Sequence, residues 1–156
     1  MVKTPPFKEL TEEQAKLVQT DWDYIKTQAN EILYNFFEKF PGNQKQFKAF
    51  IGKDLDDIKD TPEFADHAEK IATLFGQVIE NLAKDSTKIK ELINDMGLRH
   101  KDRGISKFAF LEFREAFMDF LRFNVGGSLD GMQAWTDALD SIYHVIFNNL
   151  DGTPVH

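Results

Sequence analysis

Two histidines of this chain stand where the sequence pattern asks for apolar side chains. His67 and His100 each fall on the apolar stripe of a separate predicted amphipathic helix, and Phe47 and Phe50 precede them as a short aromatic corner. A buried imidazole without a partner costs roughly 1–3 kcal/mol, so each ring needs a hydrogen bond or a ligand. If two helices each direct one imidazole into the same apolar cleft, a flat metal-containing cofactor can bind between them. Ordinary core packing is the alternative interpretation.

Other metal sites of helical proteins fail on spacing. A carboxylate-bridged di-iron bundle needs a glutamate three residues before its histidines, and the chain has Phe64, Gly97 and Ser141 at those places. The acidic run 54–60 lacks the turn glycine of a calcium loop. No second histidine follows His67 at the zinc-protease spacing. His144 lies off the apolar stripe of its helix and is interpreted as an ordinary polar residue.

The elements that must position the two histidines are predicted to be helices. Thr11 and Gln14 form a capping-box pattern at a helix start. The stripe that follows has a break near residues 27–30 and ends at Pro41, because proline lacks an amide and disfavours helical geometry in the preceding residue. Thr61 followed by Pro62 predicts the start of the helix that carries His67.

The second half of the chain continues the helical period. A polar loop is predicted at 84–87, followed by the helix that carries His100 and ends before Gly104. A phenylalanine-rich helix is predicted over about 106–124, and a last helix ends near Asp151. The irregular segment 41–60 is expected to be anchored by three buried side chains, Phe47, Phe50 and Ile51.

Composition and charge narrow the class of protein. The 156 residues fit one domain that buries its own core, and fifteen phenylalanines predict a bulky core or a lined pocket. The absence of cysteine excludes disulfides and zinc–thiolate sites. A formal charge of −7 disfavours nucleic acid and anionic membrane surfaces. No apolar run reaches the length of a membrane span, and the first residues lack the apolar block of a signal peptide.

From about residue 10 to residue 150 the chain resembles the globin family. The matching features are Pro41 followed six residues later by Phe47, then Phe50, and His67 followed one turn later by Ile71. Trp22, the turn from Met96 to His100 and the run Phe110-Leu111-Glu112-Phe113 match as well. Segments 100–105 and 134–140 are most similar to the extracellular haemoglobins of midge larvae.

The resemblance implies an all-α globin fold of seven to eight helices that encloses haem b. The globin domain would span 10–151, between an N-terminal extension (1–9) and a C-terminal tail (152–156). The implied function is reversible oxygen binding for transport or storage, not catalysis. The implied partners are molecular oxygen and other diatomic ligands, with no nucleic acid and no membrane. The protein would be a monomer or weak homodimer in the haemolymph, although the sequence is also compatible with a cytoplasmic protein.

The resemblance also implies roles for individual residues. His100 would be the proximal ligand of the iron, and His67 the distal residue that hydrogen-bonds the bound oxygen. Phe47 would stack on the porphyrin face, and Phe50 would shield its edge. Ile71 would press on the ligand space, and its bulk, greater than that of the more common valine, would swing His67 or narrow ligand access. The apolar wall would be completed by Leu33, Met96 and Ile105.

One departure from the family pattern lies beside the proximal histidine. Arg99 stands where many globins have a small hydroxyl residue that accepts a hydrogen bond from the imidazole, and arginine has no acceptor. We therefore predict that a backbone carbonyl, that of Met96, orients His100. Arg99 is alternatively expected to pair with a haem propionate. The rival functions are a haem enzyme with peroxidase or nitric oxide dioxygenase activity and a haem-free helical carrier.

Overall fold

The structure, a computed structural model, describes residues 4–156, and this part of the chain contains helices and loops but no strand. Its seven α-helices are α1 (Glu12–Ile25), α2 (Ala29–Lys39), α3 (Leu55–Ile58), α4 (Pro62–Glu80), α5 (Ser86–Asp102), α6 (Lys107–Phe120) and α7 (Leu129–Leu150). Short 3-10 turns cover Lys26–Gln28, Pro41–Gln46 and Lys48–Phe50, and a π-helical turn, Leu121–Val125, extends α6. The predicted all-α class and helix number are confirmed. Residues 1–3 of the expected N-terminal extension lie outside the described residues.

Helix ends lie where local side-chain chemistry places them. Thr11 and Gln14 form the predicted capping box, in which each side chain accepts a hydrogen bond from the other residue's backbone N–H at 3.1 Å. Thr61 caps α4, and Pro41 follows the end of α2, as expected. The predicted loop at 84–87 is wrong in its second half. The Asp85 carboxylate accepts from the Lys88 amide at 3.0 Å and starts α5 at Ser86.

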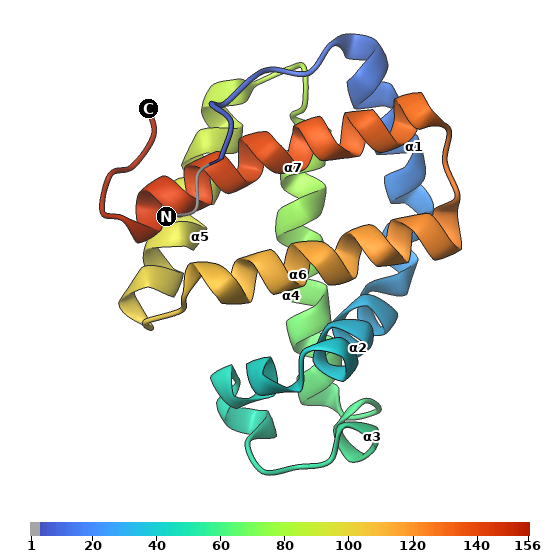
Figure 1. Cartoon of the computed structure of the whole chain (residues 1–156), viewed down its shortest axis with the longest axis vertical. Coiled ribbons are helices and arrows are strands. Elements are labelled where there is room, and N and C mark those ends of the chain that lie inside the picture. Colours follow the sequence, from blue (N-terminus) through green and yellow to red (C-terminus); the bar gives the residue numbers. More distant parts are fainter. Residues whose placement is uncertain (1–3) are drawn as a thin grey trace.

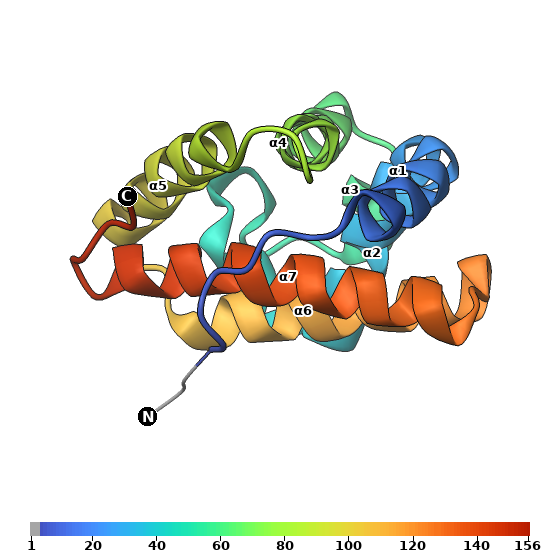
Figure 2. The ribbon, with the colours of Figure 1, turned by 90° about the horizontal axis from the view of Figure 1, so that it is seen from above.

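The helices are arranged in two layers. In Figure 1, α6 and α7 run across the molecule and α4 crosses behind them. Seen from above in Figure 2, α6 and α7 form one layer, and α1, α4 and α5 lie over it. Helix α5 packs mainly against α7, whereas α2 packs against α4 and α6. No helix within residues 4–156 has both the length and the apolar character of a transmembrane span.

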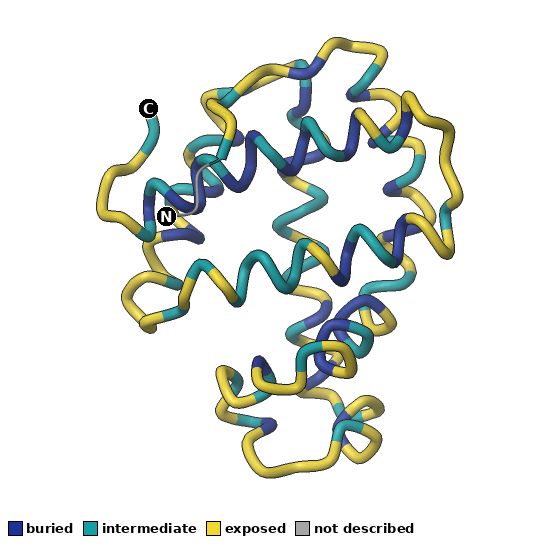
Figure 3. Tube along the Cα trace, in the orientation of Figure 1, coloured by how far each residue is buried: buried dark blue, intermediate teal, exposed yellow. Residues whose placement is uncertain are grey.

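The buried side chains form two hydrophobic clusters. Figure 3 marks the buried positions along the backbone trace. The larger cluster is built by α1, the second half of α4, and α5, α6 and α7. The smaller, which we call the aromatic cluster, joins α2, the segment 47–58 and the first half of α4, and includes Phe36, Phe37, Phe50 and Phe64. Phe113 of α6 packs against both clusters. The second half of α4 therefore packs in the larger cluster, and its first half, which carries His67, packs in the aromatic cluster.

The expected anchors of segment 41–60 are only partly confirmed. Phe50 is buried and Phe47 is half-buried in the aromatic cluster. Ile51 is 55% exposed, so its expected burial is wrong. The 3-10 turn ends at Phe50, and Ile51 continues in an extended conformation that carries its side chain into solvent.

Candidate functional site

His100 lies in the last turn of α5, and the end of that helix is closed by backbone hydrogen bonds. The Ile105 amide donates to the His100 carbonyl at 3.1 Å, and the Gly104 amide donates to the Lys101 carbonyl at 2.9 Å. Gly104 has a φ of +72°, the left-handed conformation that this pair of bonds requires. The turn therefore fixes the backbone of His100 and places Ile105 beside it.

The His100 ring is held in one orientation by its own helix. Its Nδ1 lies 2.8 Å from the Met96 carbonyl oxygen, as the sequence predicted. A carbonyl only accepts, so Nδ1 carries the proton, and in the neutral ring Nε2 keeps its lone pair. Within the described residues no hydrogen bond reaches Nε2. Burial lowers the pKa of the imidazole below 6.5, against the opposing effect of the Met96 bond, and so favours this neutral form.

An aromatic side chain supports the other side of this ring. The Phe110 ring centroid lies 5.3 Å from that of His100. The carbonyl of Phe110 accepts a hydrogen bond from the hydroxyl of Tyr143, a buried residue of α7. Both α6 and α7 therefore help to determine where the His100 imidazole lies.

His67 lies on α4 against the aromatic cluster. Its ring centroid is 5.0 Å from that of Phe47 and 5.5 Å from that of Phe50, both in edge-on geometry. Burial, with a smaller effect of the Lys70 charge, lowers the pKa of His67 below 6.5. Among residues 4–156 the ring has no hydrogen-bond partner. The neutral imidazole is thus available to donate a hydrogen bond to a ligand beside it.

The two phenylalanines of the corner are positioned by a third. Phe37 of α2 lies at the centre, with ring-centroid distances of 5.1 Å to Phe47, 6.0 Å to Phe50 and 6.2 Å to Phe64. Edge-to-face pairs of this kind are worth roughly 0.5–1.5 kcal/mol beyond their buried area. Ring packing therefore holds the segment between α2 and α4 in place, although that segment contains only short helical turns.

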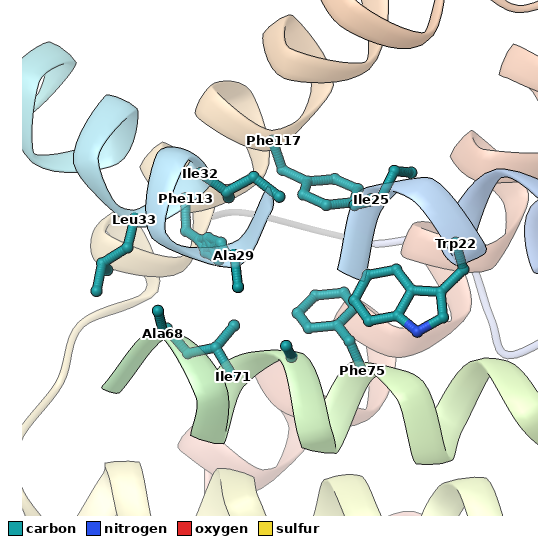
Figure 4. Close-up of a pocket in the computed structure, with 11 residues that line it drawn as sticks. Trp22, Ile25, Ala29, Ile32, Leu33, Ala68, Ile71, Phe75, Phe113 and Phe117 are labelled. Carbon is teal, nitrogen blue, oxygen red and sulfur yellow. The ribbon is translucent and has the colours of Figure 1, made fainter. Parts of the chain in front are cut away.

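Leu33 and Ile71 line an apolar cavity beside the aromatic cluster. Figure 4 shows this cavity, of about 20 Å³, with side chains from α1, α2, α4 and α6 around it. Leu33 is 2% exposed and Ile71 is half-buried. Because Ile71 is one turn from His67, the cavity lies on the His67 side of the site. Met96 is buried on the opposite side, in the larger cluster.

Charged residues surround the outer edge of the site. Arg99 is exposed and pairs with Asp95, one turn earlier on α5, at 2.7 Å. Its expected pairing with a haem propionate stays a prediction. Arg103 was not singled out from the sequence, yet its charge contributes to lowering the pKa of both His67 and His100. Its side chain is exposed at the C-terminal cap of α5, and no local pattern in the sequence reveals this effect.

The donor set restricts the kind of metal centre that fits. Nowhere in the described residues do three histidine, cysteine, aspartate or glutamate side chains converge on a point. A metal at His100 must therefore bring most of its ligands with it, as the iron of a porphyrin does. One free Nε2, a second imidazole on another helix and apolar walls fit such a flat cofactor. The fold and the residues of the site are therefore those of a helical protein with room in its donor set for a flat metal macrocycle.

Similarity to known proteins agrees with this class. A family model described as Globin matches residues 30–146. The chain is 44% identical to Globin CTT-IIIA of Chironomus thummi thummi over 99% of this chain and all of that protein. It is 39% identical to Globin CTT-Z of Chironomus thummi piger, covering 88% and 86% of the two chains. The chain therefore belongs to the globin family.

A solved structure extends the similarity to three dimensions. A haemoglobin component (TA-VII) from Tokunagayusurika akamusi superimposes with a TM-score of 0.87 at 34% identity, over 94% of this chain and 99% of that one. A Drosophila melanogaster globin superimposes with a TM-score of 0.82 at 22% identity, which supports the fold alone. Both likenesses confirm the globin fold expected from the sequence.

Proposed function

We propose that the protein binds molecular oxygen reversibly through haem b, for oxygen transport or storage. The observation that carries the proposal is the His100 ring, whose Nδ1 is held by the Met96 carbonyl and whose Nε2 is left free for a metal. Membership in the globin family supports a haem cofactor. The similar midge proteins named as globins and as a haemoglobin component support oxygen as the ligand.

His100 and the aromatic corner would hold the cofactor. A ferrous haem supplies an iron that binds diatomic ligands reversibly. His100 binds such a metal through Nε2, and the Met96 carbonyl keeps its ring from rotating. Phe47 and Phe50 give one flat face and one edge of apolar surface, and the wall is completed by Leu33, Ile71, Met96 and Ile105. These side chains exclude water, which slows oxidation of the metal.

His67 would act on the ligand rather than on the metal. Its neutral ring packs edge-on against Phe47 and Phe50, and its N–H is not engaged by any residue of 4–156. A hydrogen bond to a ligand with partial negative charge exceeds the roughly 1 kcal/mol of an ordinary one. Such a bond slows ligand loss about fivefold or more.

The absorption spectrum of the purified protein with haem tests this proposal. We expect a Soret band in the ferric, ferrous and oxygenated protein. His100→Ala should lose stably bound haem, whereas His67→Ala should keep haem but release oxygen about fivefold faster and oxidise faster. His144→Ala is the matched control, because this histidine bonds Thr4 and Asn148 away from the site.

Three results would contradict the proposal or redirect it. A protein without a Soret band would be a haem-free helical carrier. Rapid, saturable turnover of peroxide or nitric oxide would favour a haem enzyme. If His100→Ala, His67→Ala and His144→Ala all behave like the unmodified chain, the assignment of the two histidines is wrong.

We further propose that the protein works outside cells, in haemolymph, as a monomer or weak homodimer. The likeness to midge globins supports this location, and a net charge of −7 favours separate, soluble molecules. Sedimentation of the haem-loaded protein over a range of concentrations measures the association directly. A stable tetramer at low concentration would contradict the proposal.

A further inference from the structure

The helix that carries His100 packs tightly against α7 at a glycine. A Cβ built on Gly97 would lie 2.7 Å from the Cβ of Asn149, a distance that real Cβ atoms do not show. Asn149 is 2% exposed. Gly97 directly follows Met96, whose carbonyl holds the His100 ring. The contact with α7 thus acts on the same turn that orients the imidazole.

Asn149 continues this contact with a hydrogen bond to α5. Its Nδ2 donates to Asn94 Oδ1 at 2.6 Å and to the Val145 carbonyl at 2.9 Å. Both acceptors are satisfied inside the interface between α5 and α7. The side-chain amide of Asn149 therefore links its own helix to a residue six positions before His100.

The end of the chain closes over the same asparagine. After α7 the backbone turns at Gly152, where φ is +86°. It then returns along α5, as Figure 2 shows. The Asn94 Nδ2 donates to the Val155 carbonyl at 2.6 Å, and the Val155 amide donates to Asn94 Oδ1 at 3.1 Å. One side chain thus pairs with the backbone of Val155 at two points, as a neighbouring strand would.

A second pair of contacts fastens the start of this returning segment. The Thr153 amide and hydroxyl both donate to the Asn148 carbonyl, at 2.8 and 3.0 Å. Asp151 pairs with Lys107 at the start of α6 at 2.9 Å. Segment 151–156 is therefore bonded to α6, α7 and α5 in turn, and it lies across the helix that carries His100.

We infer that Asn94, Asn149 and segment 151–156 form a C-terminal clamp that positions α5 and, through it, the His100 ring. Asn94 and Asn149 are positioning residues, since neither contacts the imidazole. Helix ends fray, and His100 lies in the last turn of its helix. The clamp contacts residues 94–97 and holds this part of α5 against α7. The last turn of α5, which carries His100, can then move only by breaking its own backbone hydrogen bonds. The consequence for haem rests on the proposed function; the clamp itself does not.

The test compares the full-length chain with Asn94→Ala, which removes both bonds to Val155 and one bond to Asn149. The matched control is Asn124→Ala, because that amide bonds only a carbonyl of its own segment, that of Phe120. Hydrogen exchange of the haem-free chain should be about tenfold faster in α5 for Asn94→Ala, and unchanged in α2. Tenfold corresponds to about 1.4 kcal/mol, the contribution of one or two hydrogen bonds.

The haem-loaded protein supplies two further measurements. We expect Asn94→Ala to transfer ferric haem to an excess of an acceptor apoprotein about tenfold faster than the control. We also expect a shifted iron–histidine stretching band in the resonance Raman spectrum of the ferrous protein. A chain shortened to end at Val155 keeps both bonds to Asn94 and should resemble the full chain, whereas one that ends at Thr153 should resemble Asn94→Ala.

The outcomes separate this inference from the proposed function. If the unmodified chain does not bind haem but Asn94→Ala accelerates exchange in α5 alone, the proposed function fails and the clamp stands. If all chains bind haem alike, with the same exchange, haem transfer and stretching band, the clamp is refuted and oxygen binding stands. Faster exchange spread equally over α2 and α5 would also refute it, because that result indicates a general loss of stability.

Discussion

Replacing Gly97 by alanine should push α5 away from α7. The added Cβ would lie 2.7 Å from the Asn149 Cβ and 3.2 Å from its Cγ. The nearest atom is attached directly to the backbone of a buried residue, so a side-chain rotation cannot relieve the contact. The two helices must separate or bend instead. Because the same turn carries the Met96 carbonyl, the His100 ring should move with it.

The size of the effect follows from two opposing contributions. Forcing extra volume into a packed contact costs about 1–3 kcal/mol, and this fixed contact belongs at the upper end of that range. Alanine in place of glycine favours a helix by about 1 kcal/mol. We therefore expect Gly97→Ala to lower the free energy of unfolding by about 2 kcal/mol, even though the substitution improves helix propensity.

Urea unfolding of the haem-free chain, followed by circular dichroism, measures this change. Gly127→Ala is the control, because nothing lies within 4 Å of a Cβ built there. It should alter the free energy of unfolding by no more than about 0.5 kcal/mol. In an Asn149→Gly background the cost of Gly97→Ala should shrink, since the clashing atom is gone. A Gly97→Ala chain as stable as the unmodified one would show that the helices do not approach this closely.

Two further predictions concern the site. Gly104 has a φ of +72°, which is unfavourable for a residue with a Cβ, so Gly104→Ala should lower the free energy of unfolding by about 1 kcal/mol. The Tm of the haem-free chain should fall accordingly. An unchanged Tm would contradict the left-handed conformation of this turn. Burial lowers the pKa of His67 and His100 in the folded chain below 6.5. The free energy of unfolding therefore includes the full contribution of the two neutral rings above pH 6.5. This contribution is lost as the pH falls through the lowered pKa values. His67→Leu should therefore lose less stability between about pH 7.5 and about pH 5.5 than the unmodified chain, and an equal loss would refute this.

Much of the fold was predictable because its signals are local. Thr11, Thr61 and Pro41 act within one turn of the backbone, and the structure has helix ends at each of them. The bond from His100 to Met96 was predictable for the same reason. A side chain in a helix lies over the turn before it, and Arg99 offers no acceptor.

Other features depend on contacts between distant segments and left no pattern in the sequence. The exposure of Ile51 depends on how Phe37 and Phe64 hold Phe50, which fixes where the 3-10 turn ends. Arg103 follows the end of α5, yet its charge affects His67 of α4 as well as the neighbouring His100, and sequence spacing gives no sign of the first effect. The pairing of Asn94 with the returning C-terminal segment joins residues about sixty positions apart, far beyond the reach of helical periodicity.

The closing turn of α5 separates a backbone geometry that is fixed from side chains that are free to change. The amides of Gly104 and Ile105 bond to carbonyls, and these bonds do not depend on which side chains occupy 101–103. Those three side chains are exposed. Natural variation can therefore reverse or remove charge at the rim of the site without moving His100.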